Sequence, residues 1–209
     1  MQTQFVKLEK LNRFKGQIKC IAIFLLVMAA YGAISFLLPD NMWIISINLF
    51  LAGWLAWTFT EYFIHRFWMH DTPVAKAKPI ADYHLIHHTQ PTEMDITTLH
   101  RFMVWLVVGV LLLASIYFTI YLMPFAGFVF GFTCYTNMHW VLHQSWSVKI
   151  FPRLHRFHLY HHCKYPNSCY GVTVLWWDLV FKTTPPSEPV LLKRVTDFYF
   201  GKIPVTKKP

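Results

Sequence analysis

Four long apolar runs are the feature that most restricts how this chain can fold. A hydrocarbon core about 30 Å thick requires roughly 20 apolar residues in a helix. The runs that meet or approach this length cover residues 20–38, 42–60, 102–123 and 124–138. Only 14% of the residues are charged, whereas a soluble domain has about 25%. The sequence therefore predicts an all-α, polytopic membrane protein with four transmembrane helices.

The positions of the basic residues predict how these helices are oriented. All 19 Lys and Arg residues lie before the first run, between the second and third, or after the fourth. Because cytoplasmic segments are enriched in Lys and Arg, both termini and every histidine are predicted on the cytoplasmic side. This topology accounts for the net charge of +9 without a nucleic-acid partner. A cleaved signal peptide at residues 20–38 is disfavoured, because that run lacks a small-residue cleavage pattern.

The same pattern divides the chain into three parts. A basic cytoplasmic N-terminus covers residues 1–19, a membrane domain covers 20–184, and a C-terminal extension covers 185–209. The Pro- and Lys-rich extension is expected to lie on the surface with partial order. Within the membrane domain, residues 61–100 and 139–184 lie outside the spans. We expect them to form a helical, histidine-rich cytoplasmic cap.

Ten of the twelve histidines fall in four short clusters within this cap. They are His65 and His70; His84, His87 and His88; His139 and His143; and His158, His161 and His162. In each H-x-x-H-H motif, the imidazoles at positions i, i+3 and i+4 share one helix face. The two histidines of the first cluster are five residues apart, about 140° around an α-helix. They converge only if the helix ends there, or they bind different metals.

This number of histidines predicts a centre with two metal ions. Neutral imidazole binds Zn, Fe, Cu and Ni, and one ion takes about four to six ligands, so ten imidazoles suit two ions. An all-nitrogen set leaves the choice between iron and zinc open. Asp71 and Asp82 are the expected acceptors for imidazole N–H groups. Outside the clusters, His100 fits an interfacial anchor, His155 fits packing or the substrate entrance, and Cys163 fits a packed thiol.

The clusters and their neighbours resemble those of a known family. Glu61-Tyr62 precedes the first cluster, and the last cluster is followed by Tyr170-Gly171-Val172-Thr173 and Trp177-Asp178. Over residues 45–184 this order of motifs is similar to the fatty acid hydroxylase (sterol desaturase-like) superfamily, closest to its fatty acid/ceramide 2-hydroxylase branch. The resemblance implies that the ten clustered histidines bind two metal ions. Iron is expected in function, and zinc can take its place in purified protein.

The reaction implied by the resemblance is O2-dependent hydroxylation of a long-chain fatty acyl group at C2. The acyl group would be free or part of a sphingolipid such as ceramide, and it would enter from the bilayer. Many members carry an N-terminal cytochrome b5 domain, for which the N-terminus here has no room. Electrons are therefore expected from a separate cytochrome b5- or ferredoxin-like protein. The missing domain favours the bacterial inner membrane over the endoplasmic reticulum.

Three alternative functions stay open. Carotenoid ring hydroxylases share the first two clusters, but they space the third pair by four residues instead of three and lack the Trp177-Asp178 signature. Sterol-type oxidases of the same superfamily come next. A metal-binding membrane transporter is the non-enzymatic alternative. Transport sites tend to lie near the bilayer midplane, whereas these histidines lie past the ends of the spans, which favours an enzyme.

Overall fold

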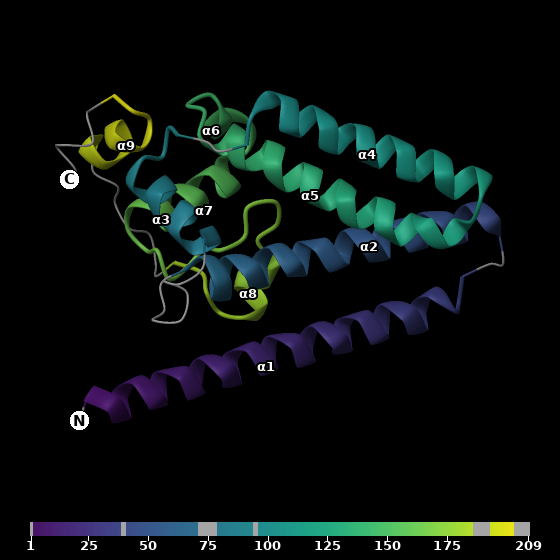
Figure 1. The fold of residues 1–209 in the computed structure, drawn as a ribbon, viewed down its shortest axis with the longest axis horizontal. Coiled ribbons are helices and arrows are strands. Elements are labelled where there is room, and N and C mark those ends of the chain that lie inside the picture. Colours follow the sequence, from purple (N-terminus) through teal and green to yellow (C-terminus); the bar gives the residue numbers. More distant parts are fainter. Residues whose placement is uncertain (1, 39–40, 71–78, 94–95, 186–192, 203–209) are drawn as a thin grey trace.

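Four long helices run along the molecule. The computed structural model describes residues 2–38, 41–70, 79–93, 96–185 and 193–202. The long helices are α1 (Gln2–Ser35), α2 (Met42–Ile64), α4 (Thr98–Tyr117) and α5 (Met123–Leu142) (Figure 1). No strand occurs in the described ranges, so the all-α fold class is confirmed for them.

Three of these helices are long and apolar enough to cross a membrane. The segments that meet this condition are Leu11–Ser35, Met42–Met69 and Thr98–Tyr117. They overlap the first three predicted spans, although α1 already begins within the basic N-terminal segment. α5 is 20 residues long and packs against α2 and α4, but it is not apolar enough to be counted with them. The fourth span therefore remains a prediction.

The turn between α4 and α5 differs from the one that the sequence predicted. The third span was expected to reach residue 123, but α4 ends at Tyr117 and a short 3-10 helix, η3 (Ile120–Leu122), leads directly into α5. The Thr119 hydroxyl caps this turn by accepting a hydrogen bond from the Tyr121 N–H at 3.3 Å. Pro124 does not separate two helices. It occupies the first turn of α5, where the N–H that proline lacks would have no helical partner.

α2 and α5 cross so closely that only glycine fits at two crossing points. A Cβ added to Gly53 would lie 1.9 Å from the Pro124 carbonyl oxygen, and one added to Gly127 would lie 1.9 Å from the Phe50 carbonyl oxygen. Small residues let helix backbones approach in a membrane, where van der Waals packing drives association. The two helices run in the same direction (Figure 1). Clustered histidines lie at the C-terminal end of each helix, His65 after α2 and His139 and His143 at the end of α5.

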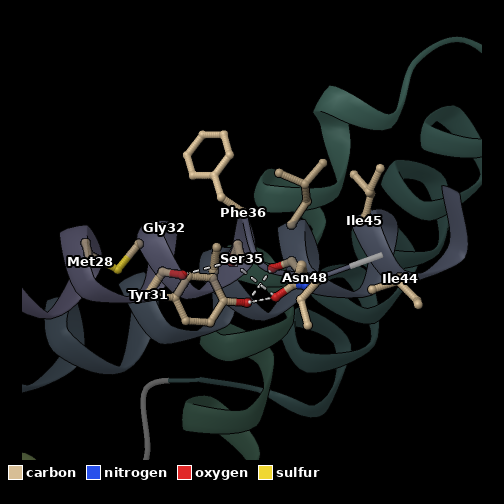
Figure 2. A pocket seen from close by; sticks show the side chains of 11 residues that line it. Met28, Tyr31, Gly32, Ser35, Phe36, Ile44, Ile45 and Asn48 are labelled. Atoms are coloured by element: carbon tan, nitrogen blue, oxygen red, sulfur yellow. Dashed lines mark hydrogen bonds between the residues drawn. The ribbon is translucent and has the colours of Figure 1, made fainter. Parts of the chain in front are cut away.

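α1 packs along α2. Phe24 stacks on Phe59 with ring centroids 4.1 Å apart. Farther from the histidines, the two helices bound a largely apolar cavity of about 590 Å³. Figure 2 shows a polar contact within it, where the Tyr31 hydroxyl lies 2.8 Å from both the carbonyl oxygen and Oδ1 of Asn48. Pairing these groups avoids the cost of unpaired polar atoms in hydrocarbon and ties the two helices together.

The short helices gather at the end where α2 and α5 stop (Figure 1). They are α3 (Pro79–Thr89), α6 (Ser147–Ile150), α7 (Pro152–Cys163), α8 (Trp176–Val180) and α9 (Lys193–Tyr199). α8 is fastened to α2 by a hydrogen bond from Trp177 Nε1 to Thr58 Oγ1, at 3.1 Å. The start of α1 lies at the same end of the molecule (Figure 1).

Candidate metal centre

The end of α2 brings the first two clustered histidines together. α2 passes into a π-helical turn, η1 (His65–Met69), and His70 then adopts an extended conformation with φ −89° and ψ 152°. π-turns inside helices are frequent at functional sites. Because the helix ends between them, His65 and His70 converge, with ring centroids 5.0 Å apart. The sequence left open whether the two histidines converge at a helix end or bind different metals. The structure has the first arrangement.

Nine of the predicted ligands form two groups in which all ligand atoms lie within 4.8 Å of one another. We name them the five-histidine set and the four-histidine set. The five-histidine set consists of His65, His70, His84, His88 and His161. The four-histidine set consists of His87, His139, His143 and His162. The tenth candidate, His158, lies beside the second set, with its Nε2 3.0 Å from Nε2 of His143.

Each H-x-x-H-H motif contributes to both sets. On α3, His84 and His88 are about one turn apart and join the five-histidine set. His87 is rotated about 100° from its neighbour and joins the four-histidine set. On α7, His161 joins the five-histidine set and His162 joins the four-histidine set. The sets meet where the rings of His88 and His162 stack, with centroids 4.2 Å apart, so the two sets are adjacent.

The nitrogen distances are those of ligands around a cation. Nε2 of His84 lies 3.0 Å from Nε2 of His65 and 2.8 Å from that of His70. It also lies 3.0 Å from Nε2 of His88. One imidazole nitrogen either donates or accepts a proton, so these three contacts cannot all be hydrogen bonds. With metal–nitrogen bonds of about 2.0–2.1 Å, ligands at 90° lie about 2.9 Å apart and tetrahedral ligands about 3.3 Å apart. Distances of 2.8–3.0 Å between these nitrogens therefore fit side chains that would share one cation.

Backbone carbonyls determine which nitrogen of several rings faces the centre. Nδ1 of His65 and Nδ1 of His161 donate to carbonyls of the 168–170 loop, at 2.6 and 2.7 Å. In the other set, Nδ1 of His87 donates to the Glu93 carbonyl at 2.9 Å. A carbonyl can only accept, so each of these rings carries its proton on Nδ1. The Nε2 lone pair is then available to a metal.

Burial keeps the imidazoles neutral. Desolvation, followed by the charges of neighbouring imidazoles, lowers the pKa of His84, His161 and His162 well below the ordinary value for histidine. Nε2 of His161 and both nitrogens of His162 are buried with no hydrogen-bond partner among the described residues. Such orphaned nitrogens are costly to bury, and a metal ion would satisfy them. The donors therefore fit a two-metal centre.

Asp82 does not take the role predicted for it. It is exposed in the first turn of α3, and no hydrogen bond joins it to a histidine in the part of the chain that the structure describes. The reason is helical geometry. Asp82 is two residues before His84, about 200° around the helix, so it faces away from the site. The other expected acceptor, Asp71, lies outside the described residues.

Two buried acids hold the loop whose carbonyls orient the histidines. Asp178 on α8 accepts hydrogen bonds from the backbone N–H groups of Tyr170 and Gly171, at 3.0 and 2.8 Å. Glu61 on α2 accepts hydrogen bonds from the next two N–H groups of the loop, at 2.7 and 2.9 Å. Loop 168–173 is therefore anchored to two helices. Sequence reasoning used both acids as part of the family signature and did not find this role.

The residues that the sequence left outside the clusters also lie outside both sets. His100 is exposed at the start of α4, where its Nδ1 lies 2.8 Å from Thr97 Oγ1. His155 is buried, and its Nδ1 lies 2.7 Å from Ser147 Oγ. Cys163 belongs to neither set of candidate ligands.

The C-terminal extension reaches the site, whereas the sequence predicted a surface segment. Tyr199 of α9 is fully buried and stacks on His143, with ring centroids 4.8 Å apart and an interplanar angle of 21°. The Tyr199 hydroxyl donates to the Leu142 carbonyl at 3.1 Å. The physical reason is the aromatic run Phe198-Tyr199-Phe200, which supplies a large apolar area to bury. This run was the sign in the sequence that could have predicted the contact.

An apolar groove lies between α4 and α5. Its volume is about 570 Å³. Its lining includes His100 and Val107 of α4 and Val129 and Thr136 of α5. Thr136 lies about one turn before His139, and a helix rises about 1.5 Å per residue, so the groove extends about 10 Å along α5.

Residues 50–183 match the family described as fatty acid hydroxylase, and this stretch holds all ten clustered histidines. The chain belongs to this family. The resemblance drawn from the motifs is thereby confirmed.

Two relatives are named as fatty acid hydroxylases. The chain is 33% identical over 149 residues to the ceramide very long chain fatty acid hydroxylase SCS7 of Saccharomyces cerevisiae. The aligned stretch covers 65% of the chain and 37% of the relative. It is 30% identical over 168 residues to the fatty acid 2-hydroxylase of Mus musculus, which covers 74% of the chain and 43% of the relative. The chain thus spans less than half the length of these two relatives.

A plant relative and a solved structure extend the comparison. The dihydroceramide fatty acyl 2-hydroxylase FAH1 of Arabidopsis thaliana is 27% identical over 161 residues, which cover 72% of the chain and 64% of the relative. The structure of full-length Scs7p, in which only the hydroxylase domain is visible, aligns with a TM-score of 0.51 at 27% identity. This alignment covers 83% of the chain and 68% of that structure. The fold is therefore similar to that of the hydroxylase domain.

Proposed function

We propose that this protein hydroxylates a long-chain fatty acyl group at C2, either as a free fatty acid or in a sphingolipid such as ceramide. The observation that carries the proposal is the convergence of ten histidines into two adjacent groups within the stretch that matches the family. The mouse and plant relatives are named as 2-hydroxylases of fatty acyl groups. These names favour an acyl substrate over a carotenoid ring or a sterol, and an enzyme over a transporter.

Two metal ions are the cofactor that suits these histidines. The five-histidine set would hold one ion, and the four-histidine set together with His158 would hold the other. Zinc has no redox chemistry, so iron is the ion that supports this function, even where zinc fills the site in purified protein. Iron bound there would supply the redox chemistry that activates O2. The chain's own residues keep the imidazoles neutral and aim their lone pairs.

The balanced reaction requires two electrons from a donor. A C–H bond, O2, two electrons and two protons give a C–OH group and water. We expect a separate cytochrome b5- or ferredoxin-like protein to supply these electrons. Arg153, Arg156 and Lys164 are exposed on and next to α7, and they would attract an acidic donor. Rising salt should weaken this docking, whereas turnover with NADH and O2 alone would contradict the need for a donor.

The groove between α4 and α5 would guide the acyl chain from the bilayer. Its lining suits hydrocarbon, and it begins about one helical turn from the ligand His139. A lipid keeps its polar head at the interface, because burying that head in hydrocarbon is costly. Only carbons close to the head then reach the metals, which favours C2 over positions in the middle of the chain.

This function requires a defined arrangement in the membrane. α5 would form the fourth span, since 20 residues of helix measure about 30 Å, the thickness of the hydrocarbon core. The cap and both termini would lie in the cytoplasm, because in the sequence all Lys and Arg residues lie before the first span, between the second and third, or after the fourth. Residues 20–184 would make up the membrane hydroxylase domain. We favour a bacterial inner membrane, with the endoplasmic reticulum as the alternative.

Lipid mass spectrometry tests the proposed reaction. The protein would be expressed in a host that makes both acyl lipids and carotenoids, together with a His161→Ala variant as the inactive control. We expect 2-hydroxylated acyl chains with the wild type and none with the variant. A hydroxylated carotenoid with unchanged acyl chains would refute the acyl substrate. Hydroxylation in the middle of the chain would refute the assignment to C2.

A further inference from the structure

The two histidine sets differ in what orients their rings. His65 and His161 of the five-histidine set are held by carbonyls of loop 168–170. In the four-histidine set, Nδ1 of His143 is buried and has no hydrogen-bond partner among the described residues. The same holds for Nδ1 of the neighbouring His158. Something other than a hydrogen bond at Nδ1 must therefore hold the His143 ring in its plane.

The aromatic ring of Tyr199 occupies the required place. It lies nearly parallel to the His143 ring, at 4.8 Å between centroids. It also approaches His162 with centroids 5.5 Å apart and His158 with centroids 6.4 Å apart. One fully buried side chain from α9 thus covers three of the histidines around this set.

We propose that Tyr199 is a positioning residue that orients His143 and thereby sets how tightly the four-histidine set holds its metal ion. The inference deepens the proposed function, since it presupposes that this set binds a metal. A stacked ring restrains the plane of the imidazole and keeps Nε2 aimed at the ion. α9 begins beyond residue 183, where the family match ends, so this support comes from outside the matched stretch.

A second layer of contacts holds Tyr199 in place. Its hydroxyl donates to the Leu142 carbonyl, one of the last carbonyls of α5, which have no partner within the helix. His155 stacks on Phe200, with centroids 5.6 Å apart, and pairs with Ser147. α9 is therefore joined to Leu142 at the end of α5 and to His155 on α7.

Metal content provides a readout that does not depend on activity. Each variant would be loaded with metal and dialysed against the highest chelator concentration at which the wild type keeps two ions per chain. Removing a group that orients a ligand lowers metal affinity by about 10–100-fold. Tyr199→Leu, which removes the ring, should therefore keep one ion. Tyr199→Phe, which keeps the ring and loses only the hydroxyl, should keep two.

Phe198→Leu is the matched control. Phe198 is also a buried aromatic residue of α9, and no described ring contact joins it to a histidine. Loosening α9 in general would affect both variants equally, whereas orientation of His143 predicts metal loss in Tyr199→Leu alone. Equal metal loss in Phe198→Leu would overturn the proposal. Retention of both ions in Tyr199→Leu would do the same.

Double variants identify which histidine set loses its metal ion when Tyr199 is replaced by Leu. In a His139→Ala background, which already lacks the ion of the four-histidine set, Tyr199→Leu should remove nothing further. In a His70→Ala background, which already lacks the ion of the five-histidine set, Tyr199→Leu should leave no ion. The reverse pattern would assign Tyr199 to the other set and overturn the inference. A wild type that never holds two ions would instead refute the two-metal proposal, so the two failures are distinguishable.

Discussion

The five-histidine set and the four-histidine set use the same type of ligand but are supported differently. Loop 168–173 supports the first set, with two carbonyls on the rings and four N–H groups bound by Glu61 and Asp178. The second set has the Glu93 carbonyl on His87 and the stacked ring of Tyr199. The comparison teaches that side chains of one type can have different structural support within one site. We therefore expect the surrounding contacts, rather than the type of side chain, to distinguish the two sets in metal binding.

Removing one ligand from each set has the largest expected effect. His84→Ala should lose the ion of the five-histidine set, and His139→Ala should lose that of the four-histidine set. Both variants should form no product, because the proposed reaction needs both ions. Elemental analysis should find one ion in each variant. Loss of both ions from either one would show that the sets are not independent.

Removing support from the loop has the next largest effect. Asp178→Ala should weaken metal binding at the five-histidine set by about 10–100-fold. It should also lower Tm, because the N–H groups of Tyr170 and Gly171 lose a buried acceptor, at about 1–3 kcal/mol each. Asp82→Ala is the control, since Asp82 is exposed. Metal titration and thermal unfolding would measure both effects, and equal changes in the two variants would contradict this role of the loop.

A smaller effect is expected from removing the hydrogen bond between Ser147 and His155, two residues that belong to neither set. Ser147→Ala removes the partner of His155 Nδ1, which should lower the free energy of unfolding by about 1–3 kcal/mol. Both ions should stay bound, because neither residue is a ligand. Denaturant unfolding and elemental analysis would check this expectation. Loss of an ion from this variant would show that support for the second set extends farther than Tyr199.

His100→Ala should have the smallest effect. His100 is exposed, and it belongs to neither set. Both ions should be retained, and the free energy of unfolding should change by less than about 0.5 kcal/mol. The same metal analysis checks this. A loss of metal as large as that in His84→Ala would break the separation between ligands and the other histidines.

Much of the fold could be predicted from the sequence, because membrane helices need long apolar runs. The first three spans follow directly from this requirement. The α4–α5 turn could not be placed, because Pro124 is compatible both with a break and with the first turn of a helix. The close crossing of α2 and α5 depends on which backbone each glycine faces, Gly53 that of Pro124 and Gly127 that of Phe50. No local pattern specifies that pairing.

The sequence by itself determined which ten histidines gather at the site, since helical periodicity places each H-x-x-H-H motif on one face. Only the tertiary structure decided that each motif is divided between two sets. The role of the acids that support the loop could not be predicted from the sequence either, because Glu61 and Val172 are 111 residues apart. The physical reason is that periodicity acts within one helix. The grouping of ligands, by contrast, depends on how α3, α7 and the end of α2 pack against one another, and on a tyrosine from α9.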